Sequence, residues 1–242
     1  MSFDVAAIDQ VLPTGGLRFG ALHEASGTGA ETEHAAAATL FLAGIAARAM
    51  ASRRRWGIWI AADPPFLPAL AGCGIDPDRL LFARTRSRAS ILQAMEDALR
   101  CKAMTVVVGE PGAELTHTAS RRLQLAAEVS GAIGLVLRRS NMFDDPRLLN
   151  PSAATTRWRI GAVPSAPAYP ERPRLRGLGP ARWQLDLVKN RGGDIGSWMV
   201  EASDAQGRLS LVSDTSDRSI APDWIGIVPR SASEPLQRRR AA

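Results

Sequence analysis

The segment 27–34 holds the residues whose types come closest to a phosphate-binding site. In the motif GxxxxGK followed by Ser or Thr, a loop before a helix offers backbone N–H groups, the lysine binds phosphates and the hydroxyl holds Mg²⁺. Here only Gly27 is in phase, while Thr32, Glu33 and His34 replace the second glycine, the lysine and the hydroxyl residue. Glu33 repels a polyphosphate instead of binding it. We therefore expect a degenerate site without catalysis and without a nucleotide cofactor.

The cysteines and histidines form no pattern typical of a metal site. Cys73 and Cys101 lie among apolar residues, and His23, His34 and His117 are scattered along the chain. Metal sites use closely spaced ligands such as CxxC or HExxH. We expect no metal ion and two buried structural thiols.

Alternating strand and helix patterns must position the loop. A strand pattern at 21–25 precedes the loop, and an alanine-rich helix pattern follows at 32–50. Four further runs are apolar or β-branched and have strand length: 56–62, 80–84, 104–108 and 132–137. Three helical patterns alternate with them: 65–73, 87–100 and 116–130. Repeated βαβ units predict an α/β fold with a mainly parallel sheet flanked by helices.

The C-terminal part of the chain has a different pattern. Apolar and polar residues alternate at 182–189 and 197–202, with a further strand at 208–212, which predicts an antiparallel meander. Between it and the helical part, only 157–163 reads as a strand. We predict four parts: a core with a degenerate phosphate loop at 1–145, a flexible Pro/Arg-rich segment at 146–180, the meander completing the core at 181–228, and a disordered basic tail at 229–242.

Basic residues are concentrated in this C-terminal third, and the net charge is +6. Basic side chains interleaved with Trp158, Trp183 and Trp198 suit single-stranded DNA, in which phosphates pair with arginine and bases stack on rings. Neighbours in a strand point to opposite faces, however, which favours core tryptophans with a solvated basic face. The candidates for binding DNA or a partner are Arg157, Arg159, Arg172, Arg174, Arg176, Lys189, Asn190, Arg191, Arg238, Arg239 and Arg240.

The N-terminus and the apolar stretches indicate a cytoplasmic protein. The first ten residues include an acid and lack the basic and apolar regions of a secretory signal. The run 35–49 is rich in small residues and too short for a membrane span. We expect a cytoplasmic protein that does not contact a membrane.

Several motifs resemble RecA and, more closely, the ImuA family of RecA-like accessory proteins in bacterial damage-induced mutagenesis. The segment 16–20 followed by Glu24 is similar to the approach to the RecA phosphate loop. The most specific motif, RWQLDLVKNRGGDIGSW at 182–198, is similar to a C-terminal signature of ImuA. The resemblance covers 13–212 and implies a RecA-like α/β fold.

Other positions depart from the RecA-type ATPases that the chain resembles. Asp63 falls where that fold places a catalytic glutamate, and Gly109 replaces the Walker B aspartate, with Glu110 one position late. Arg138 and Arg139 stand where those ATPases carry a polar residue that senses the γ-phosphate. These departures argue against ATP-driven strand exchange.

The resemblance implies a non-catalytic role in SOS-induced translesion synthesis, acting with ImuB, a catalytically inactive Y-family polymerase homologue. RecA, an error-prone C-family DNA polymerase and DNA are the further partners that it implies. In RecA filaments an N-terminal segment packs on the neighbouring subunit, and Phe3, Val5 and Ile8 form a small apolar face here. Association with itself or with RecA is therefore also expected.

Two alternatives stay open at this stage. SulA, a cell-division inhibitor that binds the division GTPase, shares a truncated RecA-like core. A residual ATPase is the other alternative, with Asp63 and Glu110 holding the metal without a lysine.

Overall fold

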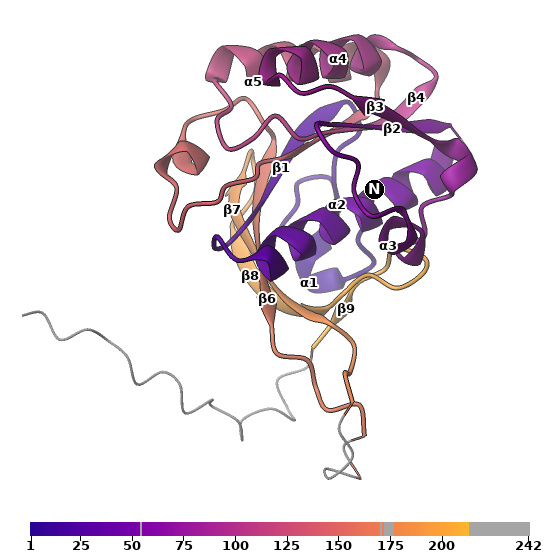
Figure 1. Ribbon diagram of the computed structural model, residues 1–242, viewed down its shortest axis with the longest axis vertical. Coiled ribbons are helices and arrows are strands. Elements are labelled where there is room, and N and C mark those ends of the chain that lie inside the picture. The colour runs from indigo at the N-terminus through magenta and orange to yellow at the C-terminus, as the bar shows by residue number, and fades with distance from the viewer. Residues whose placement is uncertain (54, 170, 172–176, 213–242) are drawn as a thin grey trace, which may run out of the picture. The chain divides into compact units, whose positions relative to one another are not determined.

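The computed structural model describes residues 1–53, 55–169, 171 and 177–212. Within them, nine strands form one mixed sheet in the order β3-β2-β4-β5-β1-β6-β7-β8-β9 (Figure 1). The strands are β1 Ala21–Gly27, β2 Trp56–Ala61, β3 Leu80–Arg84, β4 Met104–Gly109, β5 Ile133–Leu137, β6 Thr156–Val163, β7 Arg182–Asn190, β8 Gly196–Glu201 and β9 Ser210–Leu211. The helices are α1 Ala6–Asp9, α2 Thr32–Arg53, α3 Leu67–Gly72, α4 Arg88–Arg100 and α5 His117–Ser130, with 3₁₀ turns η1 Pro77–Arg79 and η2 Pro146–Leu149.

Pairing is parallel from β3 through to β6 in this order, and it is antiparallel from β6 to β9. The α/β class, the mainly parallel sheet and the antiparallel C-terminal meander are confirmed. The predicted segment 146–180 includes β6, which lies inside the sheet between β1 and β7. Residues 170, 172–176 and 213–242, in the last three predicted parts, lie outside the described residues.

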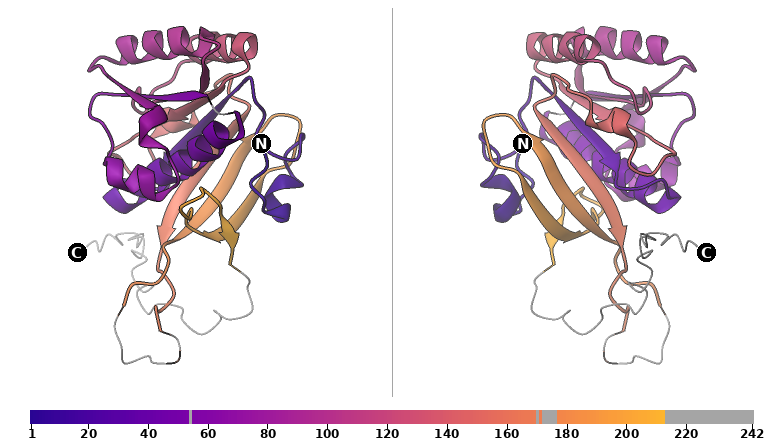
Figure 2. Two further views of the ribbon diagram at one scale, coloured as in Figure 1. Left: turned by 90° about the vertical axis from the view of Figure 1, so that its right-hand side faces the viewer. Right: turned by 90° about the vertical axis from the view of Figure 1, so that its left-hand side faces the viewer.

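Helices cover both faces of the sheet. Figures 1 and 2 show α4 and α5 side by side on one face and α2 on the other. One apolar core joins α2 to the sheet around Phe41, Trp59 and Trp158, and a second joins α4 and α5 around Met95 and Val107. Because both faces are covered, a strand such as β4 is almost wholly buried, which explains its β-branched sequence.

Local sequence fixes where the helices begin and end. Ser87 caps α4 by accepting from the backbone N–H of Ser90, and Thr116 caps α5 through Ala119. Gly131 ends α5 in the left-handed region, at φ 75°.

By length and composition α2 could cross a membrane, but 67% of its most apolar stretch is buried inside the protein.

The N-terminal segment packs on its own sheet. Phe3, Val5 and Ile8 are all buried, and the Phe3 ring lies 6.1 Å from that of Phe41 and 5.5 Å from that of Trp158. These side chains complete the core beside α2, so the apolar face expected to dock on a neighbouring subunit is used within the chain.

One of the two thiols departs from expectation. Cys73 is buried as predicted, but Cys101 is exposed. The prediction was wrong for Cys101 because this residue is the C-cap of α4, one position beyond the helix and its buried stripe.

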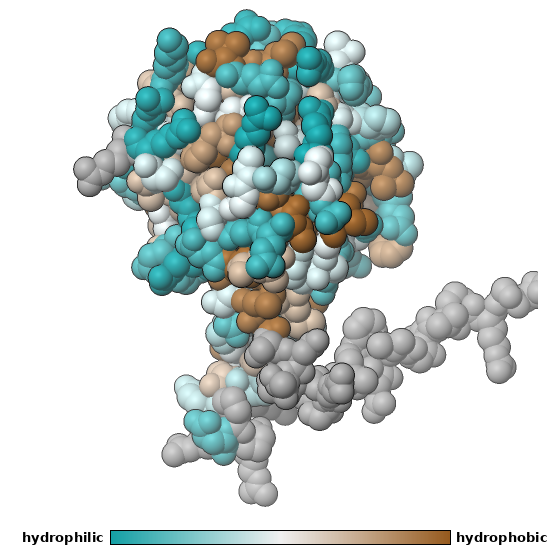
Figure 3. Space-filling model, turned by 180° about the vertical axis from the view of Figure 1, so that it is seen from behind, coloured by the Kyte–Doolittle hydropathy of each residue, from teal (hydrophilic) through white to brown (hydrophobic). Residues whose placement is uncertain are grey.

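Seen from behind, hydrophilic side chains cover much of the protein and apolar ones form small separate patches (Figure 3).

Candidate functional site

The loop between β1 and α2 is fastened to β6. The backbone N–H of Thr28 donates to the carbonyl of Ile160 at 3.0 Å, which continues the sheet past the end of β1. The backbone N–H of Ala162 donates to Nδ1 of His34 at 2.9 Å. A Cβ on Gly27 would lie 3.0 Å from the His34 backbone, which explains the glycine. His34, at the position of a Mg²⁺-binding hydroxyl, therefore ties the first turn of α2 to β6.

The start of α2 carries acids where a phosphate site carries a cation. Thr32 and Glu33 are exposed in its first turn, and Glu31 lies just before it, 3.7 Å from His34 Nε2. The helix dipole favours these carboxylates, and they repel an anion at the same place.

The space enclosed by this loop is almost closed. Between the loop, the first turns of α2 and the end of β5 lies a cavity of about 10 Å³, bordered by Gly27, Gly29, Ala38 and Arg139 among others. A single water needs roughly 10–15 Å³ of such volume. This cavity as it stands is smaller than a phosphate group, and the larger pocket described below borders the same loop.

The end of β4 carries a glycine followed by an engaged carboxylate. A Cβ on Gly109 would lie 2.1 Å from the sulfur of Met95, so a larger side chain there requires Met95 to move. Glu110 accepts a hydrogen bond from Trp59 Nε1 at 2.7 Å and pairs with Arg139. Arg139 also donates to Thr39 on α2, at 3.0 Å. Glu110 therefore joins β4, β2, β5 and α2.

Asp63 is separate from this cluster. Its side chain is 83% exposed, and it pairs with Arg84 at 2.9 Å. The two acids suggested for a residual metal site are thus both engaged with arginines.

A buried charge cluster crosses the sheet beside the loop. Glu24 in β1 and Arg138 after β5 have side chains 0% and 1% exposed, with 3.2 Å between Arg138 Nη1 and Glu24 Oε2. Arg157 in β6 reaches the same oxygen through Nε at 2.8 Å. Burial lowers the pKa of Arg138, and the adjacent Glu24 opposes that shift.

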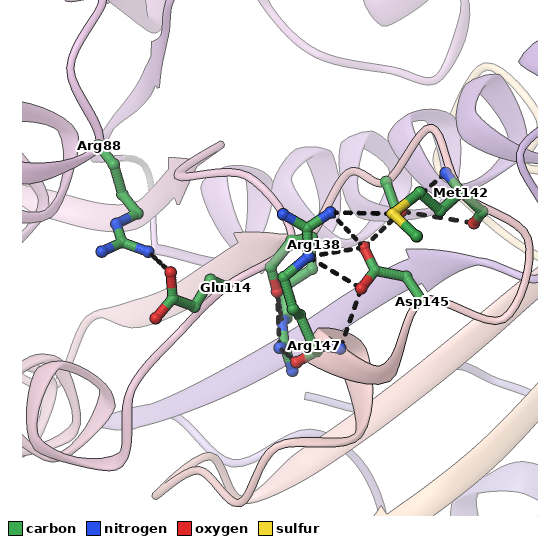
Figure 4. Close-up of polar contacts among 8 residues, drawn as sticks. Arg88, Glu114, Arg138, Met142, Asp145 and Arg147 are labelled. Carbon is green, nitrogen blue, oxygen red and sulfur yellow. Dashed lines mark hydrogen bonds and ion pairs between the residues drawn. The ribbon is translucent and has the colours of Figure 1, made fainter.

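Arg138 also organises the loops around it. It donates to the carbonyls of Ala113, Leu148 and Arg147, and Figure 4 shows Asp145 in contact with Arg147 in the loop that Arg138 holds. Hydrogen bonds from Arg147 and then Ser140 hold the pKa of Asp145 well below its usual range. Arg138 is therefore engaged within the fold, at the position where the resemblance to RecA-type ATPases implies a phosphate sensor.

A larger pocket of about 290 Å³ opens next to this cluster. Basic side chains from β6 and apolar ones from the segment after β5 form its walls, together with the loop at 27–29. Arg159 donates to the Thr28 carbonyl at 3.4 Å. At the rim, Met142 and Leu149 are 51% and 71% exposed, as is neighbouring Phe143 at 70%. The pocket combines apolar surface with Arg157 and Arg159, and Asp144 and Asp145 also line it.

Most predicted binding residues that the structure describes serve the fold. Lys189 donates to the Ser152 carbonyl at 2.6 Å, and burial lowers its pKa. Asn190 donates to the carbonyls of Val11 and Asp194, and Arg191 donates to that of Ala153. Together with Arg157 they link β7 and β6 to neighbouring loops. Six others lie outside the described residues: Arg172, Arg174, Arg176, Arg238, Arg239 and Arg240.

The tryptophans support the alternation argument. Trp158 and Trp183 are 0% and 2% exposed, whereas Arg157 and Arg159 of β6 lie on the other face. Trp198 is only partly buried and packs against the core. Buried rings cannot stack on nucleobases. Sequence reasoning missed the cluster around Glu24, whose partner Arg138 is 114 residues away, because no local spacing signals such a pair.

Comparison with known proteins gives the family. No family model matches the chain. Protein ImuA from two strains of Caulobacter vibrioides is 37% identical over 230 residues, which cover 91% of this chain and 92% of that protein. The cell division inhibitor SulA of Edwardsiella piscicida is 32% identical over 94 residues, which cover 38% of this chain and 54% of SulA. The chain thus belongs to the ImuA family, whose members are accessory proteins of SOS mutagenesis.

Proposed function

We propose that this protein is a non-catalytic, RecA-like accessory component of SOS-induced translesion synthesis that acts in the cytoplasm by binding partners. The observation that carries this proposal is the small cavity of about 10 Å³ between the loop, α2 and the end of β5, where a phosphate site of this kind holds its ligand. With His34, Glu110 and Arg139 bound to the protein itself, the fold keeps its strands and helices without the groups that bind MgATP.

ImuB is the partner that we assign to the 290 Å³ pocket and its apolar rim. Met142, Phe143 and Leu149 expose apolar surface that water solvates poorly, and Arg159 supplies a cation inside the pocket. A segment that carries both apolar side chains and a carboxylate complements this combination. RecA and an error-prone C-family DNA polymerase then join through the assembly.

A pull-down from damage-induced cells, with and without nuclease, tests the role. We expect ImuB to remain bound after nuclease treatment. Leu149→Asp should lower recovery of ImuB about tenfold, because it buries a charge in the contact. Val129→Asp is the matched control, since Val129 on α5 is 75% exposed and does not line the pocket. Equal recovery with Leu149→Asp would place ImuB elsewhere, and absence of ImuB from every sample would contradict the role itself.

DNA contact is a separable part of this proposal. Among the candidates that the structure describes, Arg159 is the one that faces the pocket without a carboxylate partner. Six further candidates lie outside the described residues: Arg172, Arg174, Arg176, Arg238, Arg239 and Arg240. Anisotropy of a fluorescent single strand at two salt concentrations measures such binding. Loss of binding in a variant with Arg172, Arg174 and Arg176 changed to glutamate would assign it to that segment.

The partial similarity to SulA supports a second candidate function, inhibition of cell division through the division GTPase. Recovery of that GTPase without ImuB or RecA in the same pull-down would favour it. Recovery of ImuB would exclude it as the main role.

A further inference from the structure

The outer edge of β3 is an unpaired strand edge. Among the described residues β3 pairs with β2 alone, and it ends the sheet on that side (Figure 1). The backbone N–H of Thr85 donates to Ala61 in β2. Because successive residues alternate direction, Phe82 and Arg84 turn their backbone N–H and C=O groups away from β2. Leu80 turns the same way, but its N–H already donates to Pro77, so only its carbonyl is open.

The side chains of this edge are apolar in the middle. Leu81 and Phe82 are 42% and 39% exposed, on opposite faces of the sheet. Exposed strand edges are usually protected by charge or by a covering element. The centre of β3 has neither protection within the described residues.

Charges of opposite sign flank the strand. Asp78 lies in η1 before β3, and Arg86 follows its end. Within the described part of the chain, neither side chain has a hydrogen bond or an ion pair. The edge therefore carries an acid at one end, a base at the other and apolar residues between them.

From this arrangement we propose that β3 pairs with β3 of a second copy, antiparallel about a twofold axis at Phe82. In such an isologous contact, residue i of one copy faces residue j of the other, and residue j of the first copy faces residue i of the second. Centring on Phe82 lets the two Phe82 residues exchange backbone hydrogen bonds, and each Arg84 N–H meets the open carbonyl of Leu80. The same antiparallel arrangement brings Asp78, in the turn before β3, towards Arg86, just after β3 of the copy, at both ends.

The symmetry of the edge is what selects a second copy over another partner. A different strand would satisfy the backbone groups, whereas an antiparallel copy of this edge also brings a complementary acid and base together at both ends. The contact is small, so the dimer dissociates readily at low concentration. The inference does not depend on the function proposed above.

Sedimentation velocity from low to high micromolar concentration tests the pairing on the full chain. We expect a reversible monomer–dimer equilibrium. Asp78→Arg and Arg86→Asp should each weaken it about tenfold by placing like charges opposite one another. The double variant restores opposite charges and should dimerise like the parent. Both positions are exposed, so folding is not at issue.

A backbone variant separates this edge from other surfaces. Phe82→Pro removes an N–H that points away from β2 and should abolish the dimer, whereas Phe82→Ala keeps the N–H and should retain part of the affinity. A chain that stays monomeric throughout, or a dimer indifferent to both single charge reversals, would overturn the proposal. Failure of the double variant to recover would overturn the register.

Discussion

The buried pairing of Glu24 with Arg138 and Arg157 predicts a large and specific loss of stability in Glu24→Gln. This change keeps the shape of the side chain and removes the anion, so two guanidinium groups face each other without a counter-charge. At an effective dielectric constant of about 20, unit charges about 4 Å apart interact by roughly 4 kcal/mol. Relief from burying the carboxylate offsets part of that loss, and breaking buried pairs costs about 3–5 kcal/mol.

Urea and thermal unfolding followed by circular dichroism measure this effect. For a domain of this size the expected loss corresponds to a fall of roughly 6–20 °C in Tm. Asp63→Asn is the matched control: it breaks a pair with Arg84 in which both side chains are more than half exposed, and it should change stability by less than about 1 kcal/mol. A loss below about 1 kcal/mol in Glu24→Gln would refute the view that this cluster supports the fold.

Two further predictions concern the core. Burial lowers the pKa of His23 to about 4, whereas the same side chain has a pKa near 6.5 in the unfolded chain. Because the unfolded chain binds the proton first, the free energy of unfolding should fall by up to about 3 kcal/mol between pH 6.5 and pH 4. Urea unfolding at several pH values measures this fall, and a flat profile would contradict it. Gly109→Ala should lower the free energy of unfolding by about 1–3 kcal/mol, because the added Cβ meets Met95. Gly72→Ala, which has open space around it, is the control and should be neutral or stabilising in the same assay. Equal effects of the two changes would contradict the packing at Gly109.

Much of the fold follows from local patterns. The strand at 104–109 and the helix at 117–130 are visible in the sequence because β-branched runs and capped amphipathic periods are local signals. The order of strands is not local. That β1 lies between β5 and β6 depends on crossover connections and on which apolar faces pack, neither of which a single segment reveals.

The contacts of the loop residues could not be predicted from the sequence. Glu33 and His34 differ from the residues of a phosphate-binding motif, but the motif does not indicate that His34 accepts a hydrogen bond from β6. Arg157 reads as an exposed basic residue, yet it covers Glu24, 133 residues away. Phe3 likewise reads as a docking residue because its core partner Trp158 is remote in sequence.

Calorimetric titration of the purified protein with MgATP measures whether the cavity beneath the loop admits a nucleotide. We expect no saturable heat up to millimolar nucleotide. We expect the same for Glu33→Lys, because a restored cation does not enlarge a cavity of about 10 Å³. Micromolar binding by the parent chain, with turnover of ATP, would contradict the proposal of a non-catalytic protein.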